Sequence, residues 1–279
     1  MTALVPKLYQ DLLSQARSHL IQIEDLNVQL YAWGHGEPCY VLLHGGYGSW
    51  AHWIRVIPEL AKRATVIVPD IPGFGRSDTP PEPHSAEGVA EILAVALDRV
   101  LDTRAYILAG FSFGGAIAGQ LAVQRPDRVR YLFLLGPGGL GAPRGTMPDL
   151  VRRTRDMTRE ELVAAHRRNL EILMVADPAS IDDLALYIQE SNTALHRLKS
   201  RPISATDVLA RALQEIHCPI RFLFGTRDAS VGEYLEARLQ IIAEVAPHAE
   251  VELLPDQGHW LMWEVSELVV DRLQSVAAH

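Results

Sequence analysis

Residues 110–115, Gly-Phe-Ser-Phe-Gly-Gly, constrain the fold of this chain more than any other stretch of its 279 residues. They follow a short apolar run at residues 106–109 and precede a helix-forming stretch at residues 116–124. A buried strand that enters a Gly-x-Ser-x-Gly turn and leaves it as a helix is the setting of a nucleophile elbow, in which a strained backbone exposes the serine hydroxyl. The pattern makes Ser112 the candidate nucleophile, against the plainer alternative of a serine in a tight turn.

Two loops further along the chain carry an acid and a histidine in a matching order. Asp228 follows the apolar run at residues 220–224, and His259 follows the run at residues 251–254. A serine hydroxyl is a weak nucleophile until a base takes its proton, and a carboxylate can orient that base and stabilise it when charged. The order serine, acid, histidine differs from the chymotrypsin and subtilisin orders. We predict that His259 is the base for Ser112 and that Asp228 orients His259.

A glycine-rich loop supplies candidates for an oxyanion hole. After the apolar run at residues 40–43, residues 44–50 read His-Gly-Gly-Tyr-Gly-Ser-Trp. Two backbone N–H groups must reach the oxygen that becomes negatively charged during attack. We assign them to Phe113, directly after the candidate nucleophile, and to Gly46 or Tyr47.

Short β-rich runs alternate with helical stretches along most of the chain. Strands are expected at residues 66–69 and 131–135, and a helix at residues 86–101. This alternation predicts an α/β fold with a mostly parallel sheet covered by helices on both faces. The active site of such a sheet lies at the carboxyl ends of its strands.

The N-terminal part is expected to add a helix and a hairpin. Residues 5–20 place leucines on one face of an amphipathic helix, which either packs on the body of the protein or serves as a dimer arm. Residues 28–33 are followed by Gly-His-Gly and are expected to begin a hairpin that leads into residues 40–43.

A glycine-rich break at residues 136–141 ends the alternation, and the chain then reads as helical up to about residue 215. We expect residues 140–215 to be a helical lid over the carboxyl edge of the sheet, where such lids shape the pocket and exclude water. Residues 1–139 and 216–279 are expected to form the core.

The early part of the expected lid is rich in arginine. One interpretation is a clamp for a carboxylate-bearing substrate. The plainer one is a solvated helix face, because Asp156, Glu160 and Glu161 are interleaved at helical spacings. The arginines are Arg152, Arg153, Arg155, Arg159, Arg167 and Arg168.

Two further segments carry a family resemblance. Residues 69–78 read Pro-Asp-Ile-Pro-Gly-Phe-Gly-Arg-Ser-Asp, and residues 258–264 read Gly-His-Trp-Leu-Met-Trp-Glu. With the motifs above, they make the chain resemble the α/β-hydrolase superfamily over nearly all its length. The resemblance implies an eight-stranded, mostly parallel sheet with a lid inserted after the sixth strand. Some members carry the acid after that strand, where this chain has Gly136, so Asp228 is left as the acid.

The histidine loop most resembles that of meta-cleavage-product hydrolases, which split C–C bonds in vinylogous diketo acids. Two positions depart from that subfamily. Phe111 precedes the serine, where those enzymes usually carry a small or amide residue. Their lid arginine, which grips the substrate carboxylate, corresponds here to His166, with Arg167 and Arg168 beside it.

A substrate pocket is expected between these loops and the lid. His44 is interpreted either as a pocket wall or as an imidazole that braces its loop through backbone hydrogen bonds. Phe111 and Trp260 are interpreted as apolar lining or as core. His166 and Arg167 are the candidates from the lid.

Composition narrows the setting in which these motifs act. The formal charge is −8, with 34 acidic and 26 basic residues, which argues against a nucleic-acid partner. Cys39 and Cys218 are the only cysteines, and we see neither a disulfide framework nor metal-ligand spacing. No signal-like start and no membrane-length apolar run is present. We expect a cytoplasmic protein without metal or cofactor that acts on a small molecule; a homodimer is left open.

The sequence therefore predicts a serine hydrolase that cleaves an ester, a lactone or a similar activated carbonyl through an acyl-enzyme. C–C hydrolysis of a vinylogous diketo acid is the alternative that the histidine loop favours. A third alternative belongs to a different class, because some members of the superfamily keep an intact triad and serve as ligand receptors, signalling partners or non-hydrolytic enzymes.

Overall fold

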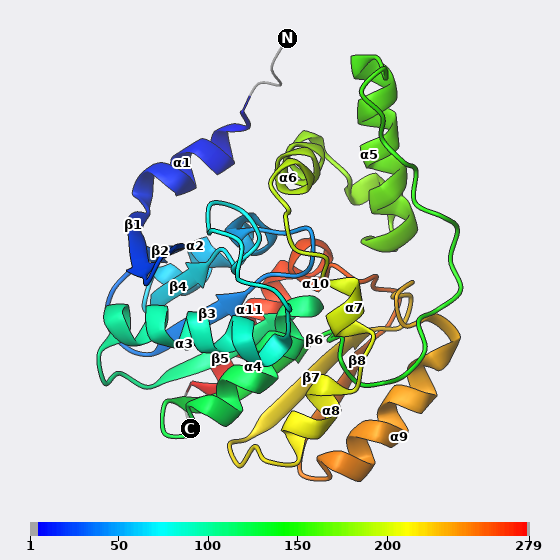
Figure 1. Ribbon diagram of the computed structural model, residues 1–279. Coiled ribbons are helices and arrows are strands. Elements are labelled where there is room, and N and C mark those ends of the chain that lie inside the picture. Colours follow the sequence, from blue (N-terminus) through cyan, green and yellow to red (C-terminus); the bar gives the residue numbers. More distant parts are fainter. Residues whose placement is uncertain (1–4, 278–279) are drawn as a thin grey trace.

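The computed structural model describes residues 5–277 (Figure 1). Eight strands form one sheet in the spatial order β1-β2-β4-β3-β5-β6-β7-β8. The strands from β4 through β8 in that order run parallel, while β2 pairs antiparallel with both of its neighbours, β1 and β4. The expected α/β fold with a mostly parallel eight-stranded sheet is confirmed. The strands are β1 (Arg17–Ile23), β2 (Leu26–Trp33), β3 (Cys39–Leu43), β4 (Thr65–Pro69), β5 (Tyr106–Phe111), β6 (Val129–Leu135), β7 (Ile220–Gly225) and β8 (Glu250–Leu254).

Helices cover both faces of this sheet, as Figure 1 shows. The α-helices are α1 (Lys7–Gln15), α2 (Ile57–Ala61), α3 (Ala86–Leu101), α4 (Phe113–Gln124), α5 (Arg159–Leu173), α6 (Asp183–Ala194), α7 (Arg201–Ser204), α8 (Val208–Leu213), α9 (Leu235–Val245), α10 (Leu261–Glu264) and α11 (Ser266–Val276). Short 3-10 helices are η1 (Trp50–Trp53), η2 (Pro178–Ser180) and η3 (Gly232–Tyr234).

The central strands are buried on both sides because alternate residues enter two separate cores. In β5, Leu108 packs into the core shared with α3, α4 and α8, while Ile107 and Ala109 pack into the core shared with α2, α10 and α11. All six residues of β5 are buried. A strand of this kind reads as a continuous apolar run, which is why the sequence located it so readily.

The N-terminal part differs from its expected form. The helix ends at Gln15, and residues 17–23, of which the first four had been assigned to it, form edge strand β1. Strand β1 pairs with β2, whereas β3 is separated from β2 by β4. The expected β2–β3 hairpin is therefore wrong, and the real hairpin is β1–β2. Its turn contains Glu24 at φ 51° and carries no Asn-Gly or Asp-Gly signal.

Between β6 and β7 the chain leaves the sheet and forms α5 to α8. Residues 142–158 contain no helix, so Arg152, Arg153 and Arg155 do not lie on the helix face that their spacing suggested. Figure 1 shows α5 and α6 standing apart from the helices that flank the sheet. In contrast, α7 and α8 pack against α4. The division into a core and a lid at residues 140 and 215 stays a prediction.

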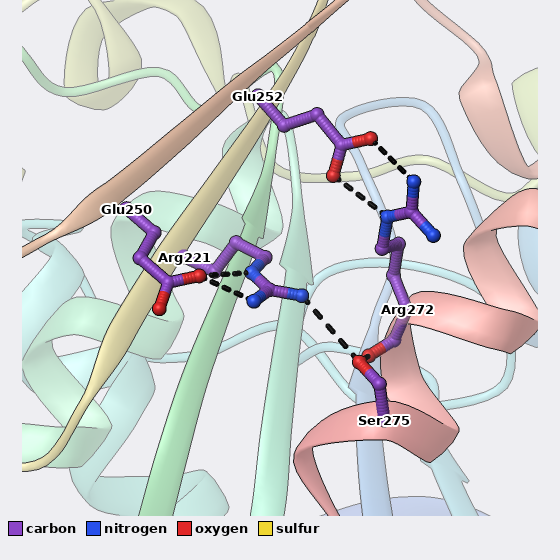
Figure 2. Close-up of polar contacts among 5 residues, drawn as sticks. All are labelled: Arg221, Glu250, Glu252, Arg272 and Ser275. Carbon is purple, nitrogen blue, oxygen red and sulfur yellow. Dashed lines mark hydrogen bonds and ion pairs between the residues drawn. The ribbon is translucent and has the colours of Figure 1, made fainter.

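Two ion-paired arginines hold the edge strand β8 in place (Figure 2). Arg221 on β7 pairs with Glu250, and Arg272 on α11 donates to both carboxylate oxygens of Glu252 at 2.8 Å. These pairs tie β8 to β7 and to α11, and the chain after β8 leads to His259. Within the described residues, no helix is long and apolar enough to cross a membrane.

Candidate functional site

Ser112 sits in a strained turn between β5 and α4. Its backbone has φ 53° and ψ −116°, a conformation that costs a non-glycine residue about 1–3 kcal/mol. The turn closes so tightly that a Cβ at Gly110 would lie 2.5 Å from the carbonyl oxygen of Gly114. A Cβ at Gly115 would lie 2.6 Å from Cβ of Pro137. The flanking glycines are therefore required by contact, as the motif suggested.

The structure brings the three residues of the expected triad into one hydrogen-bonded chain. Ser112 Oγ lies 2.9 Å from His259 Nε2, and His259 Nδ1 lies 2.6 Å from Asp228 Oδ2. A neutral imidazole offers one donor and one acceptor, so Nδ1–H donates to Asp228 and Nε2 accepts from the serine hydroxyl. This arrangement can withdraw a proton from Ser112 and stabilise the charge that forms on the ring.

Asp228 is 2% exposed and is held ionised by its neighbours. Burial alone would raise the pKa of its carboxyl, but the charge of His259 and hydrogen bonds from His259 and Ser230 hold that pKa below its ordinary value. The Ser230 amide donates to Asp228 Oδ1 at 2.8 Å. Gly136 lies beside the same pair, because its Cβ would be 3.0 Å from Asp228 Oδ2 and 3.1 Å from His259 Nδ1.

The glycine-rich loop after β3 lies directly against the serine turn. A Cβ at Gly45 would be 2.9 Å from the Phe111 ring and 3.2 Å from Ser112 Cβ. The Gly45 amide donates to His52 Nδ1 at 3.3 Å and is thereby occupied.

Three other amides near the serine turn are candidates for the oxyanion hole. Those of Gly46 and Tyr47 donate to no atom of the described residues. Phe113 is the first residue of α4, so its amide has no partner within the helix. These three donors are the ones that the sequence suggested.

His44 braces its loop. It is fully buried, its Nδ1 lies 2.7 Å from the carbonyl oxygen of Gly45, and its Nε2 accepts from the amide of Ile71 at 2.9 Å. Burial lowers the pKa of His44 to about 4, so the ring is neutral. Both ring nitrogens contact backbone groups, which is the geometry that the bracing interpretation expects, while the pocket-wall interpretation of His44 stays a prediction.

His52 is a site residue that the sequence reasoning missed. Its buried ring packs against Phe111 and Trp260, with centroids 5.6 Å and 5.3 Å apart. Burial and the nearby rings of His44 and His259 keep the pKa of His52 well below its ordinary value. No motif marks this histidine. The available signal was its position between two buried tryptophans, Trp50 and Trp53, in the short helix η1.

Phe111 and Trp260 pack against the rings of His259 and His52, and their role as pocket lining stays a prediction. The Phe111 ring lies 4.8 Å from the His259 ring, and both aromatic side chains are 1% exposed. Trp260 Nε1 donates to the carbonyl oxygen of His52 at 2.9 Å, and its ring stacks on Trp263. These contacts fix the position of the histidine loop relative to η1.

His166 and Arg167 are placed differently from each other. His166 is 2% exposed and lies 3.4 Å from Nη1 of Arg153, which also donates to Thr193 Oγ1. Burial and the Arg153 charge lower the pKa of His166 to about 4. The Arg167 guanidinium instead donates to the carbonyl oxygen of Ile181 at 3.2 Å. The cation beside His166 is therefore Arg153, from the irregular segment before α5.

Nothing in the described part of the chain gathers three or more His, Cys, Asp or Glu side chains in a way that could hold a metal ion. Both cysteines are free thiols, and burial raises the pKa of Cys39 to about 12 and that of Cys218 to about 11. Their reactivity as thiolates is correspondingly low.

Comparison with known proteins finds a matching family model and relatives that are named as hydrolases. A family model described as the alpha/beta hydrolase fold matches residues 41–265. The chain is 31% identical over 258 residues to 2-hydroxy-6-oxo-6-phenylhexa-2,4-dienoate hydrolase of Burkholderia cepacia, covering 87% of this chain and 88% of the relative. It is 30% identical to 2-hydroxy-6-oxononadienedioate/2-hydroxy-6-oxononatrienedioate hydrolase of Escherichia coli (strain K12), covering 92% and 94%.

Solved structures extend the likeness of the fold. A putative aryl esterase from Burkholderia cenocepacia superposes with a TM-score of 0.79 at 20% identity, covering 94% of this chain and 98% of that one. Est816, described as an N-acyl homoserine lactone degrading enzyme, gives 0.71 at 22% identity, covering 92% and 99%. At such identities these likenesses show the fold alone. The family model and the curated relatives go further: this chain belongs to the α/β-hydrolase family and is a hydrolase.

Proposed function

We propose that the chain is a serine hydrolase that cleaves a small-molecule ester, lactone or similar activated carbonyl through an acyl-enzyme. The observation that carries this proposal is the continuous hydrogen-bonded chain from Ser112 through His259 to Asp228. The strained backbone of Ser112 supports it, because such strain persists where the surrounding structure holds it and concentrates at functional sites.

In the proposed mechanism, Ser112 Oγ attacks the substrate carbonyl while His259 Nε2 takes the hydroxyl proton. Asp228 stabilises the imidazolium, and the amides of Phe113 and of Gly46 or Tyr47 bind the oxyanion. His259 then protonates the leaving alcohol, which departs and leaves an acyl group on Ser112. Water, deprotonated by His259, releases the acid and restores the serine. No metal or cofactor takes part in this sequence of steps.

The helical segment at residues 140–215 is proposed to act as the lid that shapes the pocket. Leu170 on α5 and Ile188 on α6 belong to the same buried cluster as Trp260 and Phe111. The inserted helices α5 and α6 therefore pack onto the same apolar core as the aromatic residues beside His259. A small, partly apolar molecule fits such surroundings.

C–C hydrolysis of a vinylogous diketo acid is the second candidate. The curated relatives at 30–31% identity are named for such substrates. Arg153 also favours it, since this part-buried guanidinium beside His166 pairs with no carboxylate among the described residues. A substrate carboxylate could bind there through charge-assisted hydrogen bonds. Replacing Arg153 with glutamine is expected to raise KM for diketo acids while leaving neutral esters unaffected.

The test is turnover of p-nitrophenyl esters, acyl lactones and a vinylogous diketo acid by wild type, Ser112→Ala and Asp228→Asn. Ser112→Ala is expected to abolish turnover with little change in stability. Asp228→Asn is expected to retain weak activity, lowered by on the order of ten-thousandfold, because the nucleophile and the oxyanion donors remain. Undiminished turnover by folded Ser112→Ala would refute the proposal. Tight binding without turnover of any carbonyl would favour a receptor role.

A further inference from the structure

Ser230 connects the candidate acid to three other parts of the site. Its amide donates to Asp228 Oδ1 at 2.8 Å, and its Oγ lies 3.2 Å from His259 Nδ1. Its carbonyl oxygen accepts from the amide of Gly145 at 3.1 Å and from Arg238 Nη2 at 3.2 Å. One residue thus contacts the acid, the base, the segment that follows β6 and a buried arginine.

The proton on His259 is shared between two acceptors. Because Nε2 accepts from Ser112, the ring proton must lie on Nδ1. That proton faces Asp228 Oδ2 at 2.6 Å and Ser230 Oγ at 3.2 Å. The Ser230 hydroxyl can accept part of it and donate its own hydrogen to the Asp228 carboxylate, which is consistent with the hydrogen bond that lowers the pKa of Asp228.

Arg238, on α9, donates to the carbonyl oxygen of Ser230 and brings a buried positive charge within electrostatic range of Asp228. The residue is 8% exposed, its Nε is buried without a partner, and no described carboxylate forms an ion pair with it. Burial lowers the pKa of its guanidinium, and the charge of Asp228 acts in the opposite direction. A buried cation without an ion pair is costly, so a nearby buried carboxylate offsets part of that cost.

We propose that Ser230 and Arg238 are positioning residues that set the basicity of His259 in opposite directions; this inference rests on the proposed function. When His259 becomes an imidazolium, its Nδ1–H becomes a stronger donor, so the bond to Ser230 Oγ strengthens and favours the protonated ring. The positive charge of Arg238 weakens the attraction of the imidazolium to Asp228 and disfavours the protonated ring.

Other polar and charged groups also face this pair and stay unchanged in the test. Ser112 contacts His259 Nε2, and the ring of His52 on η1 lies close enough to His259 for that charge to help lower the pKa of His52. Arg144, in the irregular segment after β6, lies within electrostatic range of Asp228. These groups are the same in every variant, so opposite shifts of the labelling midpoint can be assigned to Ser230 and Arg238.

The test measures the rate at which a fluorophosphonate labels Ser112 between pH 5 and 9, which requires no knowledge of the natural substrate. Ser230→Ala is expected to slow labelling about tenfold and to move the midpoint of the acidic limb to lower pH. Arg238→Met is expected to move the midpoint to higher pH, by up to about one unit. Arg238→Lys keeps the charge and is expected to keep the wild-type midpoint.

Slower labelling with unmoved midpoints in both Ser230→Ala and Arg238→Met would overturn the inference, because a merely structural role lowers the rate without changing the basicity of His259. Circular dichroism checks that each variant is folded. If Arg238→Met does not fold, the inference is tested by Ser230→Ala alone. An acidic-limb midpoint equal to that of wild type would then overturn it. Absence of labelling at Ser112 in wild type is a separate result, which would overturn the proposed function together with this inference.

Discussion

Gly45 shows at the scale of one residue how the site is assembled. The face of Gly45 that would carry a Cβ lies against the Phe111 ring and Ser112 Cβ. This contact brings the loop after β3 close to the candidate nucleophile, and the amides of Gly46 and Tyr47 have no partner among residues 5–277. The absence of one side chain therefore allows the proposed oxyanion donors to approach the serine turn.

Gly45→Ala is expected to lower kcat/KM for esters by at least about tenfold, with a loss of stability of about 1–3 kcal/mol. The added methyl would lie 2.9 Å from the Phe111 ring and must displace the loop from Ser112. Ester turnover and thermal unfolding measure the two effects.

The matched control is Gly88→Ala in α3, where the added Cβ would have Ser85 Oγ as its nearest neighbour, at 3.4 Å. It is expected to leave activity unchanged and to stabilise the helix by about 0.5–1 kcal/mol. Equal activity in both variants would contradict this role for Gly45.

The sequence located some residues of the candidate site and missed others for a physical reason. Ser112, Asp228 and His259 each follow an apolar strand, and parallel strands bring their carboxyl ends to one edge. His52 and Ser230 lie beside the site through contacts between distant segments and carry no local pattern. Their roles could be found only once those segments were placed together.

At the scale of elements, buried strands were easier to predict than exposed ones. Strand β5 is an uninterrupted apolar run with all its residues buried. Edge strand β1 reads Arg-Ser-His-Leu-Ile-Gln-Ile, is at most half-buried, and follows a helix without a glycine or proline between them. The amphipathic pattern of residues 5–20 therefore predicted a helix across a segment that pairing with β2 makes a strand.

Helix α5 begins with a complete capping box, which gives a test at the same scale. Thr158 Oγ1 accepts from the Glu161 amide at 3.2 Å, and Glu161 Oε2 accepts from the Thr158 amide at 2.8 Å. Thr158→Ala is expected to cost about 1 kcal/mol and to speed amide hydrogen exchange in the first turn of α5. Thr158→Ser keeps the acceptor and is expected to match wild type. Unchanged exchange in Thr158→Ala would show that packing alone holds this helix end.

Several histidines are buried in the fold, and their lowered pKa values keep them neutral near pH 7. Burial lowers the pKa of His44 to about 4, and burial with the Arg153 charge lowers that of His166 to about 4. The pKa of His52 is also well below its ordinary value. Asp70 has the opposite effect on stability at low pH. Burial raises the pKa of its carboxyl to about 6, although the amides of Trp50 and Arg76 donate to it.

These shifts give stability a definite pH dependence. Below about pH 6.5 the unfolded histidines bind protons that the folded ones exclude. With a folded pKa of about 4, buried His44 alone costs on the order of 2 kcal/mol by pH 5, and His52 and His166 act in the same direction. The folded Asp70 binds a proton below about pH 6, which the unfolded carboxyl does not, and this stabilises the fold by roughly 1 kcal/mol over the same range. Urea unfolding is expected to show lower stability at pH 5 than at pH 7. Equal or greater stability at pH 5 would contradict the burial of neutral histidines.

The central claim is that Ser112 is an activated nucleophile, and the most direct measurement is peptide mapping after treatment with a fluorophosphonate at pH 7.5. Wild type is expected to carry a single adduct, on Ser112, while His259→Ala labels far more slowly and Ser112→Ala not at all. An adduct on another serine, or folded wild type that stays unmodified, would contradict the account.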